Sequence, residues 1–136
     1  MNILVVEDEP TNREIVEVIL KSEGHCVTSC EDGQQALTFC LSADTKFDLV
    51  IMDILMPVMD GLEATRRLRA HTRMQEIPII CVTAKASGSD EKTGMEAGCD
   101  SYVKKPYRRK ELLAAIQQTL LVKGKILPDE VIAHDL

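Results

Sequence analysis

Acidic, hydroxyl and amine side chains follow several short apolar runs of this sequence, at the points where the runs end. In chain order they are Glu7 and Asp8, then Asp53, then Thr83, and finally Lys105. Three carboxylates brought together would repel, since two like charges about 4 Å apart cost about 4 kcal/mol at an effective dielectric of about 20. Mg2+ removes this repulsion, because it prefers carboxylate and phosphate oxygens in an octahedral arrangement that retains water. The five residues therefore predict a magnesium site.

Asp53 has the chemistry of a phosphoacceptor, because a carboxylate can act as a nucleophile toward phosphorus. Three carboxylates bring a charge of −3, which Mg2+ and one lysine balance. After phosphoryl transfer the site would carry about −1, because the phosphoryl group adds about −2 while the charge of Asp53 is lost. Thr83 supplies a hydroxyl donor and Lys105 an ammonium, and phosphoryl transfer needs little beyond positioning and charge neutralisation.

The apolar runs predict a parallel β-sheet, since continuous apolar strands are typical of sheets covered on both faces. We expect strands over 3–6, 26–30, 49–52, 77–82 and 101–103. We expect helices after Pro10, over 33–41, from Asp60 to about 71, over 89–97, and after Pro106. Five strand–helix units imply right-handed crossovers with helices on both faces. Ligands of such sheets bind beyond the carboxyl ends of the strands, where the polar residues fall.

Local signals mark the helix ends. Thr11 with Glu14 predicts a capping box for the first helix, and Asp60 with Glu63 predicts another for the third. Gly94 lies inside the fourth helix, where glycine costs about 1 kcal/mol relative to alanine.

Length and charge restrict the class of protein. With 136 residues, of which 45% are hydrophobic, the chain has the size of one domain. We assign this domain to residues 1–122 and leave 123–136 as a tail or an extra helix. A net charge of −6 argues against nucleic acid as a partner. No apolar run approaches the ~18 residues of a membrane span, and no signal peptide follows Met1, so we expect a cytoplasmic location.

Cysteines occur at an odd number of positions and form no Cys-x-x-Cys motif; they are Cys26, Cys30, Cys40, Cys81 and Cys99. This pattern favours neither a disulfide framework nor a zinc site. We interpret all five as small core residues.

Four segments together resemble the receiver domain of two-component response regulators: ILVVEDEP, DLVIMDILMPVMDG, IICVTA and SYVKKP. The resemblance covers residues 2–122. It implies an α/β, flavodoxin-like, doubly wound sheet of five parallel strands in the order 2-1-3-4-5 with five helices. It also implies that Asp53 accepts a phosphoryl group from a phosphohistidine of a sensor histidine kinase or a histidine phosphotransfer protein.

The resemblance assigns the ligands of the metal as well. Glu7 and Asp8 would hold Mg2+ together with Asp53 and the backbone carbonyl of Leu55. Thr83 and Lys105 would contact the phosphoryl oxygens.

Further roles concern signalling. Tyr102 resembles the aromatic switch residue that turns inward when Thr83 moves, and the peptide bond before Pro106 is expected to be cis. The resemblance also implies that Lys85 stands at a position that influences the lifetime of the phosphoryl group. A downstream protein would bind the face made by the fourth helix, the fifth strand and the fifth helix, and the chain would be a monomer or a weak dimer.

Other functions fit the sequence less well. A magnesium-dependent phosphatase of the haloacid-dehalogenase type needs an acid two residues after the nucleophile, where this chain has Leu55, so turnover of an external substrate lacks a general base. A flavodoxin-like carrier is disfavoured by the scarcity of aromatic residues, and a binding-only pseudo-receiver by the complete acidic cluster. A receiver fragment of a larger hybrid kinase or regulator stays open. The basic run 104–110 is either a solvated rim or part of a partner surface.

Overall fold

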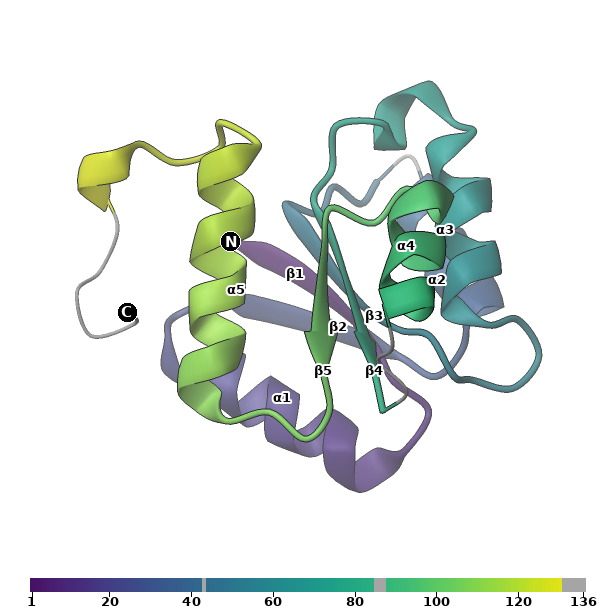
Figure 1. Cartoon of the computed structure of the whole chain (residues 1–136), viewed down its shortest axis with the longest axis horizontal. Helices are drawn as coiled ribbons and strands as arrows, with labels where there is room; N and C mark the ends of the chain where they lie inside the picture. Colours follow the sequence, from purple (N-terminus) through teal and green to yellow (C-terminus); the bar gives the residue numbers. More distant parts are fainter. Residues whose placement is uncertain (43, 85–87, 131–136) are drawn as a thin grey trace.

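Five parallel strands form one sheet in the order β2-β1-β3-β4-β5 (Figure 1). The computed structural model describes residues 1–42, 44–84 and 88–130. The strands are β1 (Asn2–Val6), β2 (Cys26–Cys30), β3 (Leu49–Asp53), β4 (Ile79–Thr83) and β5 (Ser101–Lys104). The expected order is confirmed. The fourth strand begins two residues later than expected and ends one residue later.

Helices cover both faces of the sheet, as Figure 1 shows. They are α1 (Pro10–Ser22), α2 (Gly33–Leu41), α3 (Gly61–Arg69), α4 (Gly88–Ala97) and α5 (Arg109–Val122). Helices α1 and α5 lie on one face, and α2, α3 and α4 lie on the other. Two 3-10 turns, η1 (Thr72–Met74) and η2 (Pro128–Glu130), follow α3 and α5. None of the helices in the described ranges has the length and apolarity to cross a membrane.

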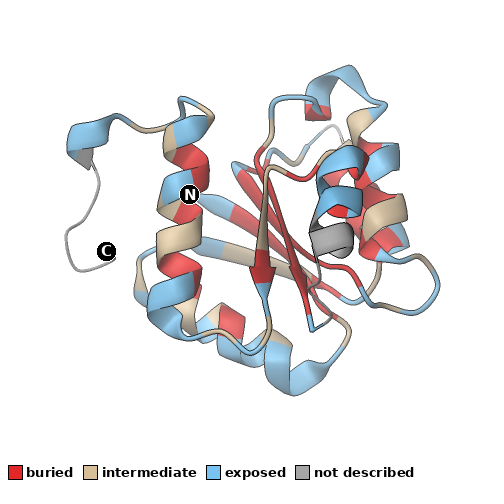
Figure 2. Cartoon of the chain, in the orientation of Figure 1, coloured by how far each residue is buried: buried red, intermediate tan, exposed pale blue. Residues whose placement is uncertain are grey.

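Alternate residues of each central strand fill two separate cores, and Figure 2 shows the buried residues concentrated in the strands. Leu4 and Val50 pack toward α2 and α3, whereas Ile3 and Ile51 pack toward α1 and α5. This alternation follows from the two-residue period of a strand. Burying one such aliphatic side chain stabilises the fold by about 1.5–3 kcal/mol, so both layers hold the sheet in place.

Helix α1 begins differently from the prediction. Its N-cap is Glu9, whose carboxylate accepts hydrogen bonds from the backbone N–H of Thr11 at 3.1 Å and of Asn12 at 2.7 Å. The expected box of Thr11 with Glu14 is therefore wrong. Pro10 occupies the first helical turn, where its missing N–H and fixed φ are favourable, so the cap falls on the residue before it.

Helix α3 has the predicted cap, since Asp60 Oδ1 accepts a hydrogen bond from the N–H of Glu63 at 2.8 Å. The helix ends at Arg69, two residues before the expected end. The Arg69 guanidinium donates to the carbonyls of Met74 and Ile77, at 2.5 Å and 2.7 Å. These bonds hold the chain as it turns away from the helix axis through η1.

The cysteines differ from the prediction in two respects. Cys81 and Cys99 form a disulfide bond between β4 and the turn before β5, and Cys26 is exposed. Cys30 and Cys40 are free and buried, as expected. The sequence did not indicate the bond, because the strand order places β4 beside β5 but does not define how the turn before β5 packs against β4.

Candidate functional site

The register of β1 and β3 places two carboxylates side by side. Val6 pairs with Met52, so the next residues, Glu7 and Asp53, are neighbours at the carboxyl end of the sheet. Their side chains are almost fully buried, and Asp8 next to them is half-buried. One carboxylate oxygen from each of the three residues lies within 4.8 Å of the others. Residues far apart in the chain thus form one group, Glu7, Asp8 and Asp53, which we call the acidic cluster.

Lys105 supplies the positive charge of the site. Its backbone N–H donates to the carbonyl of Thr83 at 2.7 Å, and the Lys105–Pro106 peptide bond is cis, as expected. Its Nζ donates to Glu7 Oε1 at 2.5 Å and to Asp53 Oδ2 at 3.1 Å. The ammonium therefore bridges the two buried carboxylates.

Burial controls the electrostatics of this group. It raises the pKa of Glu7 above the ordinary value, and the neighbouring Asp53 carboxylate raises it further, while Lys105 acts in the opposite direction. Burial would lower the pKa of Lys105, but the hydrogen bonds and negative charges of Glu7 and Asp53 outweigh this effect and raise it. The lysine is thus held in its charged form, where it can bind an anion.

Backbone contacts fix the loop that carries Glu7. The N–H of Glu9 donates to Glu7 Oε2 at 3.3 Å, and Arg13 Nη1 donates to the backbone carbonyl of Glu7 at 2.9 Å. Arg13 is not among the residues that the sequence predicts for the site. Arg13 lies near the start of α1, and its side chain reaches back to the residue that follows β1. To predict this contact, the placement of α1 relative to the end of β1 would have to be known.

A close approach fixes the loop after Asp53. The N–H of Gly61 donates to the carbonyl of Ile54 at 2.9 Å, and a Cβ at position 61 would lie only 2.1 Å from the carbonyl oxygen of Asp53. Only glycine allows α3 to begin this close to the site. The N–H of Leu55 donates to Asp53 Oδ1 at 3.3 Å, which orients the carboxylate.

Thr83 and Tyr102, the two predicted switch residues, lie in different environments. Thr83 is the last residue of β4 and is buried, one residue beyond Val82, the register partner of Asp53. Tyr102 lies in β5, half-buried against the core under α2 and α3. A Cβ at Gly94 would lie 3.1 Å from two carbons of the Tyr102 ring, so this ring faces α4.

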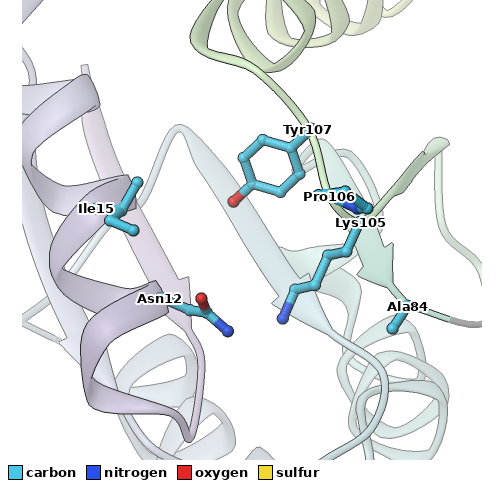
Figure 3. Close-up of a pocket in the computed structure, with 6 residues that line it drawn as sticks. All are labelled: Asn12, Ile15, Ala84, Lys105, Pro106 and Tyr107. Atoms are coloured by element: carbon cyan, nitrogen blue, oxygen red, sulfur yellow. The ribbon is translucent and has the colours of Figure 1, made fainter.

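A cavity of about 410 Å3 opens beside Lys105. Figure 3 shows Lys105 and the Tyr107 hydroxyl extending toward α1, where Asn12 and Ile15 face them. Ile15 is 52% exposed. Burial raises the pKa of Tyr107 to about 12, so its hydroxyl stays protonated and can donate a hydrogen bond. The cavity is open, largely apolar and adjacent to the acidic cluster.

The structure brings together the predicted residues that can be described. The acidic cluster and Lys105 share one site, and Thr83 borders it. Lys85 lies outside the described residues. The proposed contribution of the Leu55 carbonyl stays a prediction.

The donor set suits a hard divalent cation. The three groups of the cluster offer only carboxylate oxygens, which is the preference of Mg2+, Ca2+ and Mn2+ rather than of softer metals. Two of the three are buried beside each other with one lysine between them, so a divalent ion would relieve their repulsion. The residues therefore fit a magnesium ion.

Comparison with known proteins identifies the class. Residues 3–117 match the response regulator receiver domain family, and the chain belongs to this family. It is 39% identical over 118 residues to the DNA-binding response regulator MtrA of Mycolicibacterium smegmatis, covering 87% of this chain and 50% of MtrA. It is 38% identical over 130 residues to the response regulator MprA of Mycobacterium sp. strain KMS, covering 96% and 54% of the two chains. The chain thus spans about half the length of these relatives.

Solved structures agree with this assignment. The receiver domain of the sensor histidine kinase PA1611 from Pseudomonas aeruginosa, with a magnesium ion coordinated in its active-site cleft, has a TM-score of 0.79 and 38% identity over 88% of this chain and 96% of that one. The chemotaxis response regulator CheY4 of Vibrio cholerae has a TM-score of 0.82 and 29% identity, covering 88% and 98%. The chain is accordingly a phosphorelay receiver domain, a signalling protein of the two-component class.

Proposed function

We propose that Asp53 accepts a phosphoryl group from a phosphohistidine, with Mg2+ held by the acidic cluster and with Thr83 and Lys105 as assisting residues. The observation that carries this proposal is the single site formed by Glu7, Asp53 and the Lys105 ammonium between them. Family membership supports it, since receiver domains take part in phosphorelays.

Each side chain has a task in the transfer. The Leu55 N–H holds Asp53 Oδ1, so Oδ2, which lies 3.1 Å from Lys105 Nζ, faces the ammonium. As the phosphoryl group arrives, the ammonium exchanges part of its contact with the carboxylates for the new oxygens, because these carry more charge. Thr83 offers its hydroxyl to the same group. When bound, Mg2+ would neutralise the charge of the phosphoryl oxygens.

The position that would carry the general base of a haloacid-dehalogenase type of phosphatase holds no acid in this chain. The position two residues after Asp53 holds Leu55, an exposed apolar residue, where a general base would have to activate water. We therefore propose a phosphoacceptor that assists its own phosphorylation and dephosphorylation and has no external substrate. The predicted cytoplasmic location fits this function and stays a prediction.

The phosphodonor is proposed to be a sensor histidine kinase or a histidine phosphotransfer protein that docks over α1 and the loop after β5. Ile15 and Val18 of α1 are 52% and 61% exposed; Ile15 lines both the cavity beside Lys105 and a neighbouring hollow of about 310 Å3, and Val18 lines the second of these. Apolar surface next to the acceptor suits a protein partner that must exclude water during transfer. The downstream partner is proposed to be a protein that binds α4, β5 and α5.

Incubation with a small phosphodonor and Mg2+, followed by intact mass measurement, tests the acceptor. We expect one base-labile phosphoryl group, which disappears when EDTA is present from the start. Asp53→Asn should remove it, whereas Asp44→Asn, an exposed position in the loop before β3, should not. Phosphorylation that survives Asp53→Asn, or that ignores EDTA, would overturn the proposal.

A further inference from the structure

A disulfide bond joins Cys81 and Cys99, and neither residue takes part in the acidic cluster. The two residues are 18 positions apart, with a Cα–Cα distance of 6.1 Å. This distance lies within the range of about 4.4–6.8 Å that disulfides require. Both side chains are almost completely buried, Cys81 at 0% and Cys99 at 4% exposure. The bond therefore lies inside the molecule, between β4 and the end of α4.

The bond connects two elements that border the proposed switch residues. Cys81 is the register partner of Tyr102 and stands two residues before Thr83. The backbone N–H of Cys99 donates to the carbonyl of Gly94 at 3.2 Å. Since Gly94 faces the Tyr102 ring, the disulfide couples the last turn of α4 to the strand beside that ring.

Other interactions hold the turn between α4 and β5, which we call the corner, so the disulfide is not its sole support. Arg69 Nε donates to the carbonyl of Gly98 at 2.9 Å, and Arg69 Nη2 donates to Asp100 Oδ2 at 2.8 Å. The N–H of Asp100 donates to the carbonyl of Ile79 at 2.8 Å, and Lys123 pairs with Asp100 Oδ1 at 3.2 Å. None of these contacts involves a sulfur atom, so none of them has to break for the sulfur–sulfur bond to open.

We propose that Cys81 and Cys99 form a redox site whose disulfide state restrains the movement of α4 against β4. In the oxidation, the two thiols lose two protons and two electrons and form the sulfur–sulfur bond. A small-molecule or protein disulfide accepts them and becomes two thiols when local opening of the turn before β5 exposes the buried sulfur atoms, and a dithiol reverses the step. In reducing compartments disulfides are typically transient and redox-sensing, which suits a bond that the surrounding contacts can spare.

The consequence for signalling rests on the proposed function. Phosphorylation of Asp53 would shift Thr83 and Tyr102 between two arrangements, and the rearrangement has to be accommodated where Tyr102 meets α4. A covalent tie from β4 to the end of α4 reduces this freedom. The disulfide form therefore responds less to phosphorylation at α4 and β5 than the dithiol form does.

The first test asks whether the pair exchanges in the folded protein. The full chain is treated with oxidised glutathione or with excess dithiothreitol, with folding monitored by circular dichroism, and is then denatured, alkylated and mapped by peptide mass. We expect positions 81 and 99 to be blocked after oxidation and alkylated after reduction, reversibly. The proposal is overturned if both stay alkylated after oxidation, or if they stay linked in dithiothreitol.

The second test measures the response itself by hydrogen–deuterium exchange of α4 and β5, with and without Mg2+ and beryllofluoride as a mimic of the phosphoryl group. We expect a smaller response in the oxidised than in the reduced protein. Cys99→Ser should give the reduced behaviour under both conditions, whereas Cys40→Ser, a buried free cysteine, should keep the redox difference. Equal responses in both redox states would refute the restraint. If beryllofluoride produces no response in either state, the result counts against the proposed function. The redox site is then judged from the alkylation experiment only.

Discussion

Glu7 contributes a buried negative charge beside that of Asp53, and Lys105 neutralises only one of these two charges when no metal ion is bound. Its pKa is raised mainly by burial, so folding favours the protonated form, and stability falls as pH rises from the ordinary pKa of about 4.5 through the raised one. Glu7→Gln should therefore stabilise the metal-free protein at neutral pH by about 1 kcal/mol. The same change should remove most of the stabilisation that Mg2+ provides. Melting curves with and without Mg2+ test both expectations.

Glu14→Gln is the matched control, because Glu14 is exposed on α1. It should leave both melting curves unchanged. A Glu7→Gln protein that melts lower without Mg2+, or that retains the full Mg2+ effect, would contradict the role assigned to this carboxylate.

Lys105 should affect metal binding and phosphorylation in opposite directions. In Lys105→Met, the loss of an ammonium 2.5 Å from Glu7 and 3.1 Å from Asp53 should tighten Mg2+ binding, since like charges no longer compete for the carboxylates. The phosphorylation rate should fall about 100-fold, as for the loss of one positioned charge donor. Titration calorimetry and initial rates with a small phosphodonor measure the two effects.

The control for Lys105→Met is Lys104→Met, since Lys104 is the exposed neighbour at the end of β5. It should change neither quantity appreciably. Parallel losses of metal affinity and rate in Lys105→Met would instead indicate a collapsed site.

At the scale of elements, Gly94 makes the contact between α4 and β5 possible. A Cβ there would lie 3.1 Å from the Tyr102 ring, tighter than an ordinary contact, although alanine has the better helix propensity by about 1 kcal/mol. Gly94→Ala should therefore destabilise the wild-type protein but stabilise a Tyr102→Ala protein by about 1 kcal/mol. Urea unfolding of the wild type, the two single variants and the double variant gives the coupling free energy between positions 94 and 102. Additive effects would show that ring and helix are not in contact.

The sequence predicted the five strands and the five α-helices, because each carries its own pattern of apolar residues, but it did not predict η1 or η2. It did not predict where α1 begins, because two caps compete there: Thr11 offers a hydroxyl, but Pro10 favours Glu9 as the cap. It treated Gly94 as a weakness of the helix, because the reason for a glycine lies in β5. Local signals therefore determine whether a segment is a helix or a strand. Where it begins, and why it contains an unfavourable residue, can depend on residues that are distant in the chain.

At the scale of the whole molecule, the free cysteines report on global unfolding. Burial raises the pKa of Cys30 and of Cys40 to about 12, so neither forms a thiolate at neutral pH, while Cys26 is exposed. Iodoacetamide should alkylate one thiol of the folded, oxidised protein quickly. The thiols of Cys30 and Cys40 should react only at the rate of global unfolding. Quantitative mass spectrometry at increasing denaturant concentration measures their alkylation rates. Fast reaction of three thiols would contradict the packing of α2.

The site could be predicted from the sequence to the extent that it follows from the sheet. Parallel strands place their carboxyl ends at one edge of the sheet, so the sequence alone predicts that the acidic cluster and Lys105 lie together. The strand order comes from the family resemblance. The Arg13 contact with the Glu7 carbonyl and the Cys81–Cys99 bond could not be predicted, because they depend on how loops and helix turns pack. The topology thus defines the centre of the site, and packing defines its surroundings.

The position of the phosphoryl group tests the central claim most directly. The chain is phosphorylated with a small phosphodonor in the presence or absence of Mg2+, reduced with borohydride, which converts an aspartyl phosphate to homoserine, and mapped by peptide mass. The account predicts homoserine at position 53, only in the sample with Mg2+. Homoserine at another carboxylate, or equal conversion of Asp53 without the metal, would contradict a magnesium-dependent acceptor built from these chain-distant residues.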